Sequence, residues 1–214
     1  MIKPTLRGLK NLKTFYENDM KKLNTSFLLA LSILAIGALQ GCATNIKATS
    51  LTNPPPREAF STYGRIELKP TLFRAGYTGD EAGLARIEGN MAKNLADSLE
   101  TWNKRPANGR TLIIEPIVEE LQFTRGATRV LLGPLAGSSG VLMRIKITDA
   151  SGKIIATPEF FQRADAMAAG FLFGIHDNLM LTRVANLASK YVINNYAQAE
   201  GGSTGADDKA IGVK

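Results

Sequence analysis

Histidine, cysteine and tryptophan are almost absent from this chain of 214 residues, each occurring once, as His176, Cys42 and Trp102. One histidine and one cysteine cannot supply the ligands of a zinc site, or a catalytic Cys/His pair, from this chain alone. A single cysteine also has no partner for an internal disulfide. We therefore expect no metal cofactor and no disulfide within the chain.

Long basic runs are also missing, although the formal net charge is +7. Six basic and two acidic residues precede Cys42, which leaves 20 basic and 17 acidic residues in the rest of the chain. No basic run with interleaved aromatic residues occurs there, so the electrostatic signature of a nucleic-acid binder is lacking. We expect no nucleic-acid partner and at most a weak attraction to anionic lipid headgroups.

The longest apolar stretch, residues 27–39, is too short for a comfortable membrane span but suits the apolar centre of a signal peptide. Lys21 and Lys22 supply the positive charge that precedes such a centre. Residues 1–41 are therefore predicted to be a signal peptide. Since Met20 opens an ordinary signal sequence, we expect it to be the true start of translation.

The signal sequence ends in Leu39-Gln40-Gly41-Cys42, which resembles the lipobox of bacterial lipoproteins. Gln40 departs from this pattern, which more often has a small residue there. The resemblance implies cleavage after Gly41 and transfer of a diacylglyceryl group to the thiol of Cys42, a covalent lipid and not a cofactor. Ala43 then favours the outer membrane, with the protein facing the periplasm. The alternative is a buried helix or an uncleaved membrane anchor.

The remaining chain is long enough for one domain with its own core. Residues 42–60 are polar and contain Pro54-Pro55-Pro56, which is typical of a stiff, extended tether. We predict a single globular domain over residues 61–198. Residues 199–214 are rich in Gly, Ser, Thr and Asp and are predicted to be disordered.

Two segments show the spacing of amphipathic helices. Apolar residues recur at steps of three and four over residues 82–104, and a second stripe falls within residues 177–197. The first stripe comprises Leu84, Ile87, Met91, Leu95, Leu99 and Trp102, and the second Leu181, Val184, Leu187 and Tyr191.

Four segments are predicted to be strands: 63–69, 112–124, 141–149 and 153–163. In the third, Val141, Met143, Ile145 and Ile147 alternate with polar residues. Asp149-Ala150-Ser151-Gly152 suits a tight turn, which makes the last two strands a hairpin. The fold class is thus α/β, or α+β in layers, with one mainly antiparallel sheet of four or five strands and two helices on one face.

The order of these elements resembles a family of secreted bacterial lipoproteins known only as a domain of unknown function. The matching stretches are Phe123–Gly126, Gly133–Gly140 and Thr148–Lys153, and the likeness covers residues 60–195. It implies an α/β fold and a periplasmic location, and it offers no catalytic residues.

Enzymatic motifs are sparse. His176 adjoins Asp177 at the predicted start of the last helix, where it is either a general base or metal ligand, or a residue beside an Asp N-cap. The glycine-rich stretch 133–140 lacks the Lys and Ser/Thr that follow the last glycine of a phosphate-binding loop. A pocket joining His176 and a carboxylate to Ser138 or Ser139 would favour a hydrolase.

Other charged residues allow two interpretations. Glu115, Glu119 and Glu120 are either paired carboxylates of a glycosidase or charges facing solvent. On a regular strand Glu119 and Glu120 face opposite sides, which argues against the pair. Arg125 and Arg129 either bind an anion or a lipid headgroup, or lie at a solvated hairpin end.

Two apolar, glycine-rich segments, 130–135 and 168–175, are unusual for connections between elements, which are normally polar. They either pack on the core or form an exposed apolar patch for a partner or a bilayer. The hairpin should bring Gly140 and Arg163 together, so that both segments emerge on one side of the domain. The candidate interface residues are Leu131, Leu132, Leu135, Phe171, Leu172 and Phe173.

The sequence therefore predicts a membrane-anchored envelope lipoprotein that is not an enzyme. We expect it to act as a binding or accessory module, through a protein partner or self-association at the apolar segments. The alternative is a cell-envelope hydrolase acting on cell-wall or lipid material.

Overall fold

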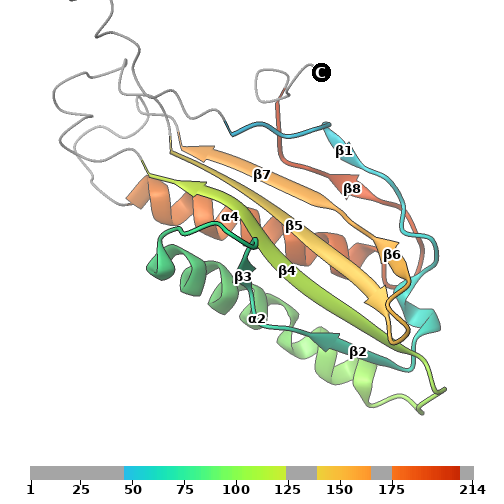
Figure 1. The fold of residues 1–214 in the computed structure, drawn as a ribbon. Helices are drawn as coiled ribbons and strands as arrows, with labels where there is room; N and C mark the ends of the chain where they lie inside the picture. Colours follow the sequence, from blue (N-terminus) through green and yellow to red (C-terminus); the bar gives the residue numbers. More distant parts are fainter. Residues whose placement is uncertain (1–45, 124–138, 165–174, 208–214) are drawn as a thin grey trace, which may run out of the picture. The chain divides into compact units, whose positions relative to one another are not determined.

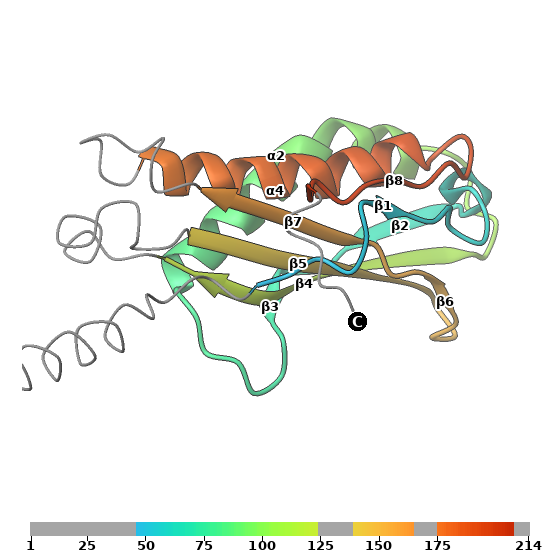
Figure 2. The same cartoon turned by 90° about the horizontal axis from the view of Figure 1, so that it is seen from above.

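A computed structural model describes residues 46–123, 139–164 and 175–207. Within these ranges a six-stranded sheet carries two helices on one face (Figures 1 and 2). The mixed α/β content and the mostly antiparallel sheet confirm the predicted class. The predicted number of four or five strands is wrong.

Two long antiparallel strands, β4 and β5, form the middle of the sheet. The short strands β2 and β3 both run parallel to β4 on its outer side, and β6 and β7 both run antiparallel to β5 on the other side. The bounds are β2 Arg65–Leu68, β3 Leu72–Phe73, β4 Thr111–Gln122, β5 Ser139–Asp149, β6 Ile154–Ala156 and β7 Glu159–Ala164.

Each edge of the sheet is interrupted near a proline, which explains the extra strands. Pro70 lies between β2 and β3, and Pro158 between β6 and β7. Proline has no backbone N–H to donate to a neighbouring strand, so the ladder breaks where it falls. The segment 153–163, predicted as one strand, is therefore two.

The helices α2 (Glu81–Asn103) and α4 (Ile175–Asn194) pack against each other and the same sheet face (Figure 2). Asp80 caps α2, its Oδ1 accepting a hydrogen bond from Gly83 N at 2.6 Å. Both predicted stripes are confirmed. Ile87, Met91, Leu95, Trp102, Leu181, Val184 and Tyr191 are buried, and Leu84, Leu99 and Leu187 are half-buried.

The core lies between the helices and the sheet. Val141, Met143, Ile145 and Ile147 of β5 are fully buried there, which confirms the predicted alternation. The hairpin turn also forms as predicted: Asp149 Oδ1 accepts from the backbone N–H groups of Ser151 and Lys153. Gly152 adopts φ +85°, a conformation that glycine tolerates best.

The described part of the segment predicted as a tether, residues 46–60, packs against the domain. Ile46 and Ala48 are 3% and 1% exposed, and Phe60 is fully buried in the core at the start of the 3₁₀ turn Phe60–Thr62. Between them, β1 (Thr52–Asn53) pairs antiparallel with β8 (Gly202–Ser203). The tether prediction depended on the polar composition of the segment. Its few scattered apolar residues give too weak a pattern to predict this packing.

The described part of the predicted disordered tail is also packed. After α4, Asn195 is fully buried and its Oδ1 accepts from Glu200 N and Gly201 N, which turns the chain back toward β1. Thr204 is buried as well, and its carbonyl accepts from Phe161 N of β7. Residues 199–207 therefore lie along the domain, because side-chain hydrogen bonds replace the apolar contacts that their composition lacks.

Candidate functional site

Most of the predicted site residues lie outside the described residues. This is so for Cys42 and the Leu39–Gly41 signal, and for all six candidate interface residues, Leu131, Leu132, Leu135, Phe171, Leu172 and Phe173. His176 is the second residue of α4. Ser139 is the first residue of β5 and is fully buried.

The strands that flank the two apolar segments end together. Gly140 pairs with Arg163, as predicted, while Gln122 also pairs with Gly140 and Ser139 with Ala164. We call this edge, with Phe123 and the first turns of α4, the loop end (Figure 1). Residues 124–138 and 165–174 both connect to the described structure here, at the opposite end from the Asp149–Gly152 turn.

Both helices begin at the loop end (Figure 1). A cavity of about 350 Å³ there is lined by residues from the starts of α2 and α4 and by Phe123, which follows β4. Asp80, Arg86 and Asn178 supply its polar groups, and Phe123 and Leu181 its largest apolar side chains.

The N-terminal segment runs alongside β7 and packs on the sheet face opposite the helices, which we call the outer face (Figure 1). Ile46 and Ala48 form a small hydrophobic cluster with Leu142 of β5 and Phe161 of β7. Following the chain backwards from β1, the segment runs toward the loop end (Figures 1 and 2). The described chain thus begins close to the point where the apolar segments attach.

A buried carboxylate fixes this segment. Glu159 is 5% exposed, and its Oε1 accepts hydrogen bonds from Thr49 N at 2.7 Å and Thr49 Oγ1 at 3.1 Å. Its backbone pairs with the Asn53 side chain, which both donates and accepts at 2.8 Å. No local signal in the sequence could reveal these contacts, because more than 100 residues separate the partners.

Two further acidic residues of the outer face, Glu119 and Glu115, lie in ion pairs. Glu119 Oε1 is 3.6 Å from Arg144 Nε, and Lys146 Nζ is 3.0 Å from Glu115 Oε2. A bulge between Val118 and Glu120 shifts the register by one residue. Because of it, Glu119 and Glu120 both face outward, and the prediction that they face opposite sides is wrong.

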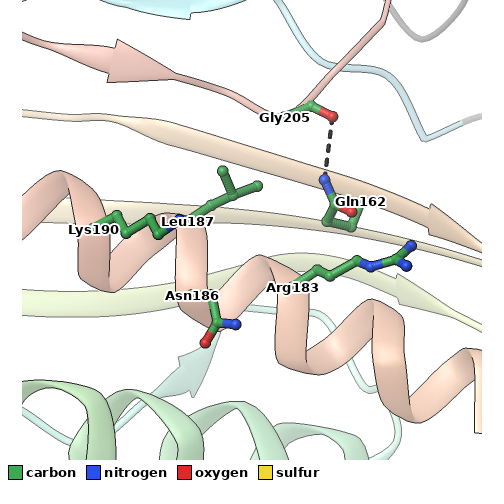
Figure 3. A pocket seen from close by; sticks show the side chains of 6 residues that line it. All are labelled: Gln162, Arg183, Asn186, Leu187, Lys190 and Gly205. Atoms are coloured by element: carbon green, nitrogen blue, oxygen red, sulfur yellow. Dashed lines mark hydrogen bonds between the residues drawn. The ribbon is translucent and has the colours of Figure 1, made fainter.

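A second cavity, of about 290 Å³, lies between α4, β7 and the C-terminal segment (Figure 3). Gln162 Nε2 donates to Gly205 O across it at 3.2 Å. Arg183 and Lys190 line it from α4 and are exposed, and within the described part of the chain neither forms an ion pair. Figure 3 shows the Arg183 and Lys190 side chains extending in opposite directions along α4, so their charges do not converge on one point of the cavity.

The described ranges hold neither a metal-binding cluster nor a membrane-spanning helix. In residues 46–123, 139–164 and 175–207, His, Cys, Asp and Glu side chains nowhere gather in threes to hold a metal ion. Over the same residues, neither helix is long and apolar enough to cross a membrane.

No family model and no curated protein matches this chain. Several solved structures show distant similarity, among them these three. A single-residue variant of the PelC dodecamer from Paraburkholderia phytofirmans is 14% identical, with 62% of this chain and 90% of that chain covered and a TM-score of 0.38. The PelC dodecamer from the same organism is 12% identical, with 67% and 95% covered and a TM-score of 0.36. A minor lipoprotein from Acinetobacter baumannii is 10% identical, with 65% and 98% covered and a TM-score of 0.33. Scores this low assign neither a fold nor a function.

Proposed function

We propose that this protein is a lipoprotein of a bacterial cell envelope, anchored by lipid on Cys42 and facing the periplasm from the outer membrane. The observation that carries the proposal is the position of the only cysteine, directly after Leu39-Gln40-Gly41. All described structure begins after it, at Ile46, so cleavage after Gly41 leaves the described domain intact. Two or three acyl chains on one residue suffice for stable anchoring.

The domain acts by binding, as an accessory module, with the loop end as its binding surface. Support comes from the paired strand ends, which bring the attachment points of both apolar segments to one edge. The carboxylates Glu115, Glu119 and Glu159 form ion pairs with strand cations, an arrangement that stabilises the sheet.

The anchor is tested by metabolic labelling with a fatty-acid probe. Cys42→Ala removes the thiol that accepts the diacylglyceryl group, so the variant should accumulate as a larger, unlabelled precursor. A Ser98→Ala variant, changed on α2 and outside the signal sequence, serves as the control and should be labelled normally. Labelling of the Cys42→Ala protein would refute the anchor.

The binding role is tested by placing a charge in each apolar segment. Leu132→Asp and Phe171→Asp should leave a folded, lipidated protein whose crosslinked species in cells are lost. Ile193→Asp, at a 39% exposed apolar residue near the far end of α4, is the matched control and should keep them. If both the Leu132→Asp and Phe171→Asp variants unfold in thermal melts of the domain without its anchor, the segments are core, since a charge in a dry core is costly.

A further inference from the structure

The packed N-terminal segment leaves little free chain between an anchor on Cys42 and the domain. Four residue steps separate Cys42 from the buried Ile46, and a fully extended chain of that length spans at most about 14 Å. A free tether ending at residue 60 would have allowed any orientation of the domain. The observed packing restricts it.

The position of Ile46 decides which end of the sheet the anchor can reach. Its cluster partners Leu142 and Phe161 each lie three residues from the loop end, about 10 Å along a strand. The Asp149–Gly152 turn begins seven residues from Leu142 in the other direction, about 23 Å away. The link from Ile46 to Cys42, at most about 14 Å long, can therefore extend past the loop end but cannot reach the turn.

The outer face is also within reach, but its chemistry suits water. It carries the Lys146–Glu115 pair and the Arg144 side chain, which are 49%, 39% and 43% exposed. The loop end instead presents two apolar side chains among exposed polar ones such as Gln122 and Asn178: Phe123, which is half-buried, and Leu179, which is 42% exposed in the second turn of α4. An apolar surface gains more from contact with lipid than a ladder of exposed ion pairs.

We propose that the loop end, at Gln122, Phe123 and Leu179, docks on the lipid bilayer that holds Cys42. The strands then stand away from the membrane, and the Asp149–Gly152 turn faces the aqueous compartment. The inference rests on the proposed lipid anchor and names the partner of the binding surface as a bilayer.

Single-cysteine labelling tests this orientation, because acylation blocks the only native thiol. The full lipidated protein would carry a fluorescent label at Gln122→Cys or Leu179→Cys for the loop end, at Lys146→Cys for the outer face, or at Ser151→Cys for the turn. Each variant is placed in phosphatidylethanolamine and phosphatidylglycerol vesicles that contain a headgroup quencher. Quenching at both loop-end sites should exceed that at Ser151 by at least about threefold, because an eleven-residue strand separates the two ends. Lys146 should give an intermediate value.

Three results would overturn the proposal. Equal quenching at Gln122 and Ser151 would show no preferred end, and the strongest quenching at Lys146 would show that the outer face lies on the membrane. Energy transfer between labelled copies at Gln122, without quenching by lipid, would assign the loop end to a second copy. Failure of every variant to bind vesicles, with Cys42 unlabelled by fatty acid, would instead refute the anchor itself. Quenching restricted to the loop end supports both the anchor and the proposed orientation.

Discussion

Glu159 joins two parts of the chain that are far apart in sequence. Its carboxylate accepts two hydrogen bonds from Thr49 and lies 3.5 Å from Arg144, while its backbone pairs with Asn53. A carboxylate as buried as this one is tolerated only with such partners. Glu159 therefore holds the N-terminal segment on β7.

Replacing this carboxylate should loosen the segment. Glu159→Ala leaves Thr49 N without its acceptor and Arg144 without one of its two carboxylates, so we expect a loss of about 2 kcal/mol in the free energy of unfolding. Glu119→Ala removes the other, more exposed partner of Arg144 and should cost less than about 1 kcal/mol. Denaturant unfolding of the two variants measures the difference. Equal losses would contradict the role given to Glu159.

Because two buried tyrosines have raised pKa values, we predict that the protein loses stability at alkaline pH. Burial raises the pKa of Tyr191 to about 12, and burial followed by a hydrogen bond to Glu58 raises the pKa of Tyr63 to about 12. An unfolded tyrosine titrates near 10, so these groups stabilise the fold fully below pH 10 and lose that contribution as the pH rises toward 12.

Tyr191→Phe tests this contribution. The variant keeps the ring and loses the O–H that donates to Pro54 O, so it should be less stable than the parent at pH 8 and should lose less stability between pH 10 and 12. Denaturant unfolding across this pH range measures both effects. Parallel pH profiles for parent and variant would contradict the assignment.

The elements that the sequence predicted well are those whose pattern lies within one segment. The helix stripe through Ile87, Met91 and Leu95 and the alternation along β5 each repeat locally, so the period alone reveals the buried face. The pairing of Gly140 with Arg163 followed from one tight turn. For the candidate site, this placed the attachment points of the apolar segments correctly.

The elements that the sequence missed depend on distant partners. Thr204 Oγ1 donates to Ser50 O across 154 residues, so composition at either end of the chain could not indicate that the ends pair. The split between β6 and β7 was missed because β-rich residues continue on both sides of Pro158. The bulge at Glu119 is likewise set by pairing with β5 and not by its own sequence.

Pairing of β1 with β8 depends on the glycine that precedes β8. Gly201 has φ +82°, and a Cβ there would overlap Asn53 O and approach Pro54. Gly109 has φ +78° with open space around it, so it isolates the cost of the backbone conformation.

Replacing these two glycines separates the cost of a strained backbone conformation from the cost of disturbed packing. Gly109→Ala should cost about 1 kcal/mol in unfolding free energy, and Gly201→Ala clearly more, because β1 must also shift. Hydrogen exchange at Thr204 N, which donates to Leu51 O at 3.0 Å, should speed up only in the Gly201 variant. Equal costs and unchanged exchange would show that the β1–β8 pair contributes little.

In the described domain as a whole, the N-terminal and C-terminal segments both lie along β7. The N-terminal segment is bonded to Glu159, and the Thr204 carbonyl accepts from Phe161 N, so one strand fixes both. This arrangement turns a segment of tether-like composition into part of the domain. It leaves residues 43–45 as the chain between the proposed anchor and the first buried residue.

The length of that short link should therefore control how the lipidated protein stands on a membrane. Inserting ten Gly and Ser residues after Thr44 gives a flexible link whose end-to-end distance is about 20 Å by random-coil scaling. Fully extended, the fourteen residue steps from Cys42 to Ile46 would span up to about 50 Å, which exceeds the distance of about 23 Å to the turn. The difference in lipid quenching between Gln122→Cys and Ser151→Cys labels should therefore shrink. The melting temperature should stay unchanged, because no described contact is altered. A scrambled insert of the same length and composition controls for the order of its residues and should behave in the same way. A quenching difference as large as in the parent would show that contacts of the loop end, and not the length of the link, orient the domain.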